Sequence, residues 1–178
     1  MARTFIFLGP PGCGKGTQAA RLAENRRVVH FDMGSALRAE VAAGGELAAQ
    51  ITPHASKGSL VPLPIVHRLL ERFFHSHAKD DIVLDGFPRS ADQVELIEAM
   101  LPGLRRSVDA VILFELDEEE ILRRIVHRRY CPQCGRVYNL RTDPPRDNER
   151  CDKCRHPLAQ REDDSEAVLA ERLRVYRE

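Results

Sequence analysis

The sequence predicts an α/β fold built around a parallel sheet, and three features support this. Short apolar runs alternate along the chain with longer stretches of helical periodicity. The runs are apolar at successive positions, as expected for strands that are covered on both faces. Two of them end abruptly in glycine and proline. This alternation is typical of parallel strands joined by crossover helices, which form the layers on either side of the sheet.

Four apolar runs supply the expected strands. Residues 4–8 (Thr-Phe-Ile-Phe-Leu) are stopped by Gly-Pro-Pro-Gly, and residues 82–84 (Ile-Val-Leu) are stopped by Asp-Gly-Phe-Pro. The other two runs cover residues 27–31 and 110–114. None of the four alternates between apolar and polar residues, which favours buried strands.

Helical patterns fill the intervals between these strands. Two of them begin with the spacing of a capping box, at Ser90-Ala-Asp-Gln93 and at Asp117-Glu-Glu-Glu120. In the final pattern, Leu169, Leu173 and Tyr176 fall on one stripe. The expected helices cover residues 15–25, 34–43, 46–57, 63–77, 91–100, 118–129 and 165–177.

The composition is that of one folded domain with a small insertion. Of the 178 residues, 43% are hydrophobic and 30% are charged. No apolar run approaches the roughly 18 residues that cross a bilayer, and the first run is too short for a signal peptide. We therefore expect a cytoplasmic protein without a membrane partner. The 27 basic residues are matched by 27 acidic ones, which gives no support for a nucleic-acid partner.

A glycine-rich loop, residues 9–17, joins the first strand to the first helix. Its glycines allow backbone N–H groups to curl around an anion, and Lys15 lies where it could reach the outer phosphates. A strict phosphate-loop motif has serine or threonine directly after lysine, whereas here Gly16 intervenes before Thr17. A glycine- and proline-rich turn is the structural alternative. Within a phosphate loop, Cys13 is expected to be a small loop residue rather than a nucleophile.

Four of the five cysteines form two close pairs, Cys131/Cys134 and Cys151/Cys154. This spacing fits a four-thiolate zinc ribbon, and four protein ligands leave no open position for chemistry. We therefore expect a structural Zn²⁺ in the polar segment 130–160, which is too short to build its own core. A reduced or redox-active dithiol is the alternative.

Several blocks of sequence together resemble the adenylate kinases of the nucleoside monophosphate kinase family. The loop at 9–17 resembles the phosphate loop of that family, and residues 84–89 (Leu-Asp-Gly-Phe-Pro-Arg) resemble its strand-to-helix turn. Further similar blocks are residues 34–38, 58–62, 128–129, 160–164 and Arg172. They occur in the order of the family and span essentially the whole chain.

The resemblance implies a three-layer P-loop NTPase fold and reversible phosphoryl transfer from MgATP to AMP, giving two ADP. An acceptor monophosphate is already an anionic nucleophile, so catalysis needs alignment and charge neutralisation rather than a general base. The resemblance further implies a core of residues 1–127 and 162–178, a monophosphate-binding insertion at 32–61, and a zinc-binding lid at 128–161. It also implies a monomer whose partners are ATP, AMP and ADP, with Mg²⁺ as the cofactor of ATP.

The same resemblance implies the residues of each site. The catalytic residues are Lys15, Arg89, Arg128, Arg161 and Arg172. The ATP site is Gly12, Cys13, Gly14, Lys15, Gly16, Thr17, Arg124 and Arg128. The AMP site is Met33, Gly34, Arg38, Val61, Gly86, Arg89, Gln93, Arg161 and Arg172. Thr17 and Asp85 hold magnesium through water, and Cys131, Cys134, Cys151 and Cys154 hold zinc.

Three departures from the family pattern affect these expectations. Met33-Gly34-Ser35 replaces the usual Thr-Gly-Asp, which removes a hydroxyl near the acceptor base. Asp32 stands where a small hydroxyl residue is common. The family normally continues beyond the position of Glu178 with another strand and a helix, whose absence exposes the edge of the sheet and weakens ATP binding. A truncated form, a natural short form and a partner that completes the sheet all remain open.

Three alternatives to an adenylate kinase follow. A pyrimidine monophosphate such as UMP or CMP is the nearest rival acceptor. A nucleotide-binding protein without turnover is a second possibility. A zinc-ribbon protein that binds nucleic acid is a third, and it is disfavoured by the neutral charge and by the surrounding kinase-like blocks.

Overall fold

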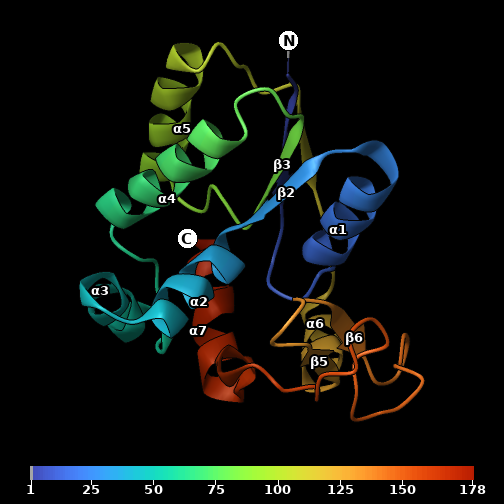
Figure 1. Cartoon of the computed structure of the whole chain (residues 1–178). Helices are drawn as coiled ribbons and strands as arrows, with labels where there is room; N and C mark the ends of the chain where they lie inside the picture. Colours follow the sequence, from blue (N-terminus) through green and yellow to red (C-terminus); the bar gives the residue numbers. More distant parts are fainter. Residues whose placement is uncertain (1) are drawn as a thin grey trace.

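A four-stranded parallel sheet forms the centre of the computed structural model, which describes residues 2–178 (Figure 1). The strand order is β2-β3-β1-β4, and every neighbouring pair is parallel. The bounds are β1 (Thr4–Leu8), β2 (Val29–Asp32), β3 (Ile82–Asp85) and β4 (Ala110–Leu113). The expected α/β fold with a parallel sheet is confirmed.

Helices cover both faces of this sheet. Figure 1 shows α4 and α5 on one side and α1 on the other. Residues at successive positions of a strand point to opposite faces, so Ile82 and Leu84 join the core beneath α4 and α5, while Val83 joins the core beneath α1. The helices are α1 (Lys15–Arg26), α2 (Met33–Ala43), α3 (Glu46–Ala55), α4 (Leu63–Ser76), α5 (Ala91–Gly103), α6 (Glu118–Val126) and α7 (Glu166–Arg177), with a 3₁₀ turn at Glu162–Asp164.

The larger core owes most to α4. Its apolar residues recur at helical spacing, and Ile65, Leu69, Leu70 and Phe74 are all buried against the sheet. Pro64 lies in the first turn, where its missing N–H has no helical partner to lose. This packing fixes β3 between β2 and β1 and so sets where the carboxyl end of β3 emerges.

Several local predictions were wrong. The second strand begins two residues later than expected because Arg27 adopts a left-handed conformation (φ 54°) at the end of α1. The helix expected over residues 118–129 ends at Val126, because the next residues form strand β5 (Arg128–Tyr130) and pair with β6 (Val137–Asn139). Tyr176 is exposed, unlike the other two residues of its predicted stripe.

Neither predicted capping box forms. The side chains of Ser90 and Asp117 make no capping hydrogen bond to their helices. The amide oxygen of Gln93 instead accepts a hydrogen bond from the backbone N–H of Arg89, at 2.8 Å. The side chain of Gln93 therefore orders the turn before α5 rather than the first residue of that helix.

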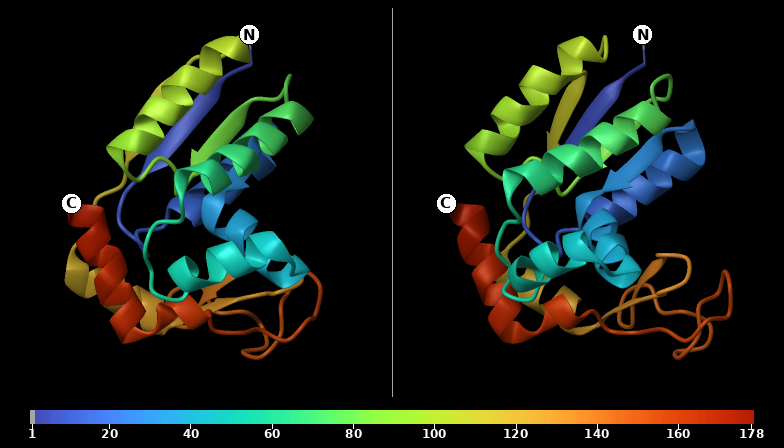
Figure 2. Two further views of the ribbon diagram at one scale, coloured as in Figure 1. Left: turned by 90° about the vertical axis from the view of Figure 1, so that its left-hand side faces the viewer. Right: turned by 60° about the vertical axis from the view of Figure 1, so that its left-hand side comes forward.

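One end of the sheet gathers the remaining elements. Figure 2 shows α2, α3, α7 and the segment that follows α6 at the end from which the strands run out at their carboxyl termini. Functional sites of parallel α/β sheets lie at this end. The crossover connections thus bring residues from most of the chain to one place.

β4 is an edge strand, and no strand among the described residues pairs with its outer side. Three consecutive apolar side chains on this edge are exposed, namely Val111, Ile112 and Leu113. The outer edge of β4 is therefore exposed. Among the described residues, no helix is both long enough and apolar enough to cross a bilayer.

Candidate active site

The glycine-rich loop lies between the carboxyl end of β1 and the start of α1. Gly12 and Gly14 both adopt positive φ angles, 80° and 106°, which glycine tolerates best. At Gly12 a Cβ atom would lie 2.9 Å from the side chain of Ile125 on α6, so this position has no room for a larger residue. The loop is therefore held against α6 and opens onto the N-terminus of α1, an arrangement suited to an anion.

Lys15 folds back over this loop. Its Nζ donates hydrogen bonds to the carbonyl oxygens of Gly9 and Pro10, at 2.7 and 2.8 Å. Burial lowers the pKa of Lys15 because the ammonium group loses hydration there. A cation held in this way gains by binding an anion in the loop.

Asp85, at the end of β3, faces the same loop. A Cβ atom on Gly16 would lie 3.1 Å from its Oδ2, which places the carboxylate beside the first turn of α1. The side chain of Asp85 is buried, whereas Thr17 is exposed on that turn. His30 Nε2 lies 3.3 Å from Asp85 Oδ2, a contact that sequence reasoning missed. The residues expected to hold magnesium therefore lie at the loop.

A separate pocket lies between α2, α4 and the turn after β3. Six of the expected AMP-site residues line it together: Met33, Gly34, Val61, Gly86, Arg89 and Gln93. Arg89 Nε donates to the carbonyl oxygen of Gly86 at 2.8 Å, and burial lowers the pKa of Arg89. Four further residues line the pocket: Leu37, Ser59 and Leu60, which belong to the family-like blocks 34–38 and 58–62 but were not assigned to the site, and Val66, which sequence reasoning missed.

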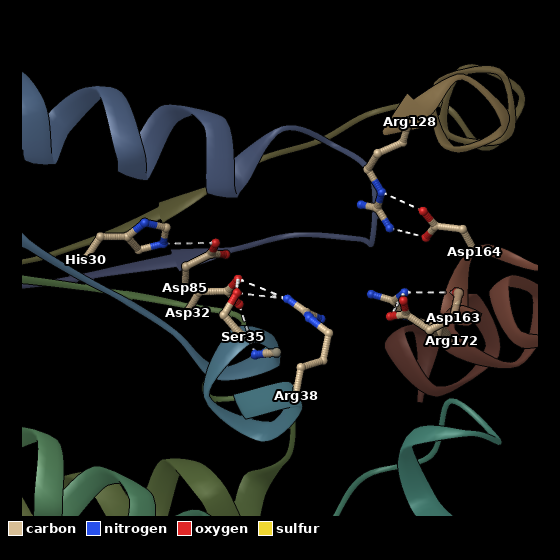
Figure 3. A network of polar contacts seen from close by, with 10 residues as sticks. His30, Asp32, Ser35, Arg38, Asp85, Arg128, Asp163, Asp164 and Arg172 are labelled. Atoms are coloured by element: carbon tan, nitrogen blue, oxygen red, sulfur yellow. Dashed lines mark hydrogen bonds and ion pairs between the residues drawn. The ribbon is translucent and has the colours of Figure 1, made fainter. Parts of the chain in front are cut away.

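Arginines converge on the space between the loop and this pocket (Figure 3). Arg128 pairs with Asp164 through two hydrogen bonds, and Arg172 Nη1 donates to Asp163 Oδ2 at 2.8 Å. In the sequence, Asp163 and Asp164 are only part of a family-like block, whereas the structure shows which arginine each one holds. Both carboxylates lie in the short turn that leads into α7.

Arg161 is a buried arginine with an unsatisfied hydrogen-bond donor. Its Nε is buried without a hydrogen-bond partner, and the guanidinium lies 5.5 Å from the centre of the Tyr130 ring. Burial, together with the charges of Arg128 and Arg38, lowers the pKa of Arg161 to about 10. Burial also lowers the pKa of Arg172 to about 10. Cations that are buried and close to other cations are stabilised when a polyanion binds among them.

Arg124, expected at the donor adenine, lies at the rim of the loop. Its Nη1 would be 3.9 Å from a Cβ atom on Gly14. Its Nε donates to Glu120 Oε1 at 2.8 Å, one turn back along α6. Asn139 donates to the carbonyl oxygen of Arg124 and so ties β6 to the end of α6.

The four paired cysteines meet in one cluster. Their sulfur atoms all lie within 4.8 Å of one another, close to the roughly 3.8 Å between sulfurs around a tetrahedral zinc with Zn–S bonds of about 2.3 Å. The two loops have matching geometry: Gly135 N donates to Cys131 O at 2.9 Å, and Arg155 N donates to Cys151 O at 2.8 Å. The donor set and its geometry fit Zn²⁺ well.

Comparison with known proteins agrees with this geometry. A sequence model of the family described as adenylate kinase matches residues 7–178. The chain belongs to the adenylate kinase family. A curated adenylate kinase from Archaeoglobus fulgidus is 44% identical over 175 residues, which are 98% of this chain and 81% of that protein. The adenylate kinase of Petrotoga mobilis is 41% identical over 97% of this chain and 80% of its own length.

The adenylate kinase of Thermosipho africanus is 42% identical over 98% of this chain and 82% of its own length. Membership of the adenylate kinase family makes the chain a nucleotide phosphotransferase with the P-loop α/β fold. The glycine-rich turn occupies the position between β1 and α1 that the phosphate loop has in this fold.

Proposed function

We propose that this chain transfers a phosphoryl group reversibly from MgATP to AMP, giving two ADP. The observation that carries the proposal is the pair of sites at one end of the sheet. A phosphate loop with Lys15 lies on one side, a pocket with Arg89 and Gln93 lies on the other, and buried arginines lie between them. Two nucleotides bound head to head would place their phosphates among these cations.

In this proposal the donor triphosphate lies in the loop of residues 12–17. Lys15 and the loop N–H groups hold its outer phosphates, and Arg124 lies against the adenine. Mg²⁺ bound to ATP would neutralise charge on the donor phosphates, with Thr17 and Asp85 orienting its water ligands. Burial of Asp85 and its contact with His30 support a fixed orientation of that carboxylate.

The acceptor lies in the second pocket. Arg38 and Arg89 hold its phosphate, Gln93 reads its base, and Met33 and Val61 flank that base. No general base is needed because the acceptor phosphate is itself the nucleophile. Arg128, Arg161 and Arg172 neutralise charge on the group in transfer, a role supported by the buried and unpartnered Nε of Arg161.

We further propose that residues 128–161 act as a lid over the donor site and that residues 32–61 form the acceptor-binding insertion. Zinc would rigidify the lid, since the segment has only a small apolar core around Tyr138. Closure would exclude water from the phosphates and bring Arg128 and Arg161 to them. All of these groups belong to one chain, which supports a monomer as the working form.

A pyrimidine monophosphate is the second candidate acceptor. The buried Met33 offers the base no hydroxyl group, and its pocket neighbours Val61, Val66 and Leu37 are also apolar. Base selection then depends mainly on Gln93. This makes the acceptor, rather than the reaction, the point that needs measurement.

The test is ADP formation by the purified, zinc-loaded chain, with Mg²⁺ and ATP fixed and AMP, CMP, UMP and GMP supplied separately. Turnover with AMP alone supports the proposal. A preference for CMP or UMP would keep the chemistry but overturn AMP as the acceptor. A folded chain that binds ATP and forms no ADP with any acceptor would overturn the proposed activity.

A further inference from the structure

One carboxylate at the acceptor side has no part in the reaction as proposed. Asp32 is the last residue of β2 and precedes the first turn of α2. In the parallel pairing of β2 with β3 it lies opposite Asp85, so two acidic residues end adjacent strands at the site. A second negative charge beside two phosphate groups opposes their binding unless it does something else.

Asp32 makes one contact that caps α2 and two that connect it to Arg38 (Figure 3). Its Oδ1 accepts a hydrogen bond from the N–H of Gly34 at 2.9 Å and caps α2. Its Oδ2 accepts from the hydroxyl of Ser35 at 2.5 Å, and that same hydroxyl accepts from Arg38 Nη2 at 2.9 Å. Arg38 Nη2 also lies 3.5 Å from Asp32 Oδ2.

This arrangement places the Arg38 guanidinium over the first turn of α2. A Cβ atom on Gly34 would lie 3.1 Å from Arg38 Nη1 and 3.2 Å from Asp32 Oδ1, so glycine alone leaves room for both groups. Gly34 itself lines the acceptor pocket. Arg38 itself does not line the pocket, but its guanidinium and the N-terminus of α2 lie beside Gly34, at the edge where an acceptor phosphate would bind.

Without its contacts to Asp32 and Ser35, Arg38 would be a long side chain near the surface of a helix. Its side chain is still 34% exposed with these contacts in place. Ordering a free arginine on binding costs side-chain entropy, and a carboxylate that orders it beforehand removes part of that cost. Arg89 and Arg161 are further cations near Asp32, and neither donates a hydrogen bond to it among the described contacts.

We propose that Asp32 is a positioning residue which, with Ser35, holds Arg38 at the acceptor pocket for the phosphate of the monophosphate substrate. This inference rests on the proposed function. Asp32 acts through Arg38 and does not touch the substrate. Its effect therefore falls on the affinity for the acceptor, and the phosphoryl-transfer step itself is left largely unchanged.

The first variant is Asp32→Asn, whose amide oxygen can still cap Gly34. Loss of the charged hydrogen bonds is expected to raise KM for AMP about tenfold, with KM for ATP and kcat changed less than about twofold. Glu40→Gln is the matched control. It also removes one negative charge from α2, but Glu40 pairs with Arg72 on α4 and does not line the pocket.

A double-mutant cycle separates positioning from a structural role. Arg38→Met weakens AMP binding by itself, and adding Asp32→Asn in that background should weaken it no further. Binding of AMP is measured by calorimetry as well as by turnover. An equal loss from Asp32→Asn in both backgrounds, or tighter AMP binding in the single variant, would overturn the inference.

Ser35→Ala keeps the charge and the cap but removes the hydroxyl between Asp32 and Arg38. It should raise KM for AMP about threefold, and it provides the test if Asp32→Asn fails to fold. An unchanged KM would count against the inference. Failure of the proposed function is recognised separately, because the wild-type chain would then form no ADP from ATP and AMP, whereas the calorimetric comparison of AMP binding needs no turnover.

Discussion

At the scale of single residues, the site holds more positive than negative charge. Lys15 and five arginines at positions 38, 89, 128, 161 and 172 face four carboxylates at positions 32, 85, 163 and 164. Burial prevents water from compensating the difference, as the lowered pKa values of Lys15, Arg161 and Arg172 indicate. A bound polyphosphate would neutralise this excess of positive charge.

Lys15→Met tests this view at the phosphate loop. The variant keeps the length and flexibility of the side chain but removes the cation, so we expect kcat to fall by a factor of at least about 10² to 10³. The melting temperature should not fall, because a desolvated cation is lost together with its two backbone contacts. Lys79→Met, at an exposed position away from the site, is the control. Full activity of Lys15→Met would show that the loop assignment is wrong.

Asp163→Asn tests the pairing with Arg172 through its pH dependence. Burial opposes ionisation of Asp163, but the charges of Arg172, Arg38 and Arg161 outweigh it and lower its pKa below the usual value. The stability that the ionised group contributes is therefore present above the unfolded pKa of about 3.9 and is lost as pH falls through the folded pKa.

At pH 7 the free energy of unfolding of the variant should be about 1–2 kcal/mol lower than that of the wild type. This difference should shrink as the pH falls below about 4. Urea unfolding at several pH values measures this difference. Glu95→Gln removes an exposed carboxylate on α5 and should show no such trend. A difference that stayed constant down to pH 3 would contradict the ion pair as its source.

At the scale of elements, the observed ends of helices and strands differ from the predicted ones where pairing between distant segments competes with the local sequence pattern. The helical pattern after Val126 gives way to β5 because three backbone positions pair with β6. Arg128 thereby moves from a helix surface to the start of a strand, where it meets Asp164. No local signal reports such a partner, which lies 36 residues away.

The cysteine loops are the element whose stability depends most on a ligand. Removing zinc should lower the melting temperature by about 5–10 °C, because four thiols at this spacing cannot replace metal–sulfur bonds. Calorimetry of loaded and chelator-treated protein, with zinc content measured on both, makes the comparison. Cys134→Ser should lose zinc, whereas Cys13→Ala should retain it. Equal melting temperatures with and without zinc would refute a structural role.

At the scale of the whole molecule, the exposed edge at β4 is the main liability. Unpaired backbone groups and the apolar side chains of Val111, Ile112 and Leu113 form a template for another strand. We expect the 178-residue chain to associate weakly as its concentration rises, and Val111→Lys to suppress that association without loss of turnover. Light scattering against concentration measures the effect. The control is Val126→Lys, at an exposed position on α6, which should suppress the association far less.

The sequence by itself determined the class of fold and the identity of the main chemical groups. Apolar runs, glycine spacing and cysteine spacing act over a few residues, so they can be recognised before the chain is folded. The glycine-rich loop and the four-cysteine cluster were predicted in this way, and the family resemblance named six residues that line one pocket.

Only the tertiary structure decided which charges meet. His30 and Asp85 lie 55 residues apart and come together because β2 and β3 are neighbours in the sheet. Asp32 and Arg38 are close in the sequence, but their contact lies beside Gly34, which lines a pocket that α4 and the turn after β3 complete. Electrostatic interactions depend on distance and burial in space, and packing sets both of these.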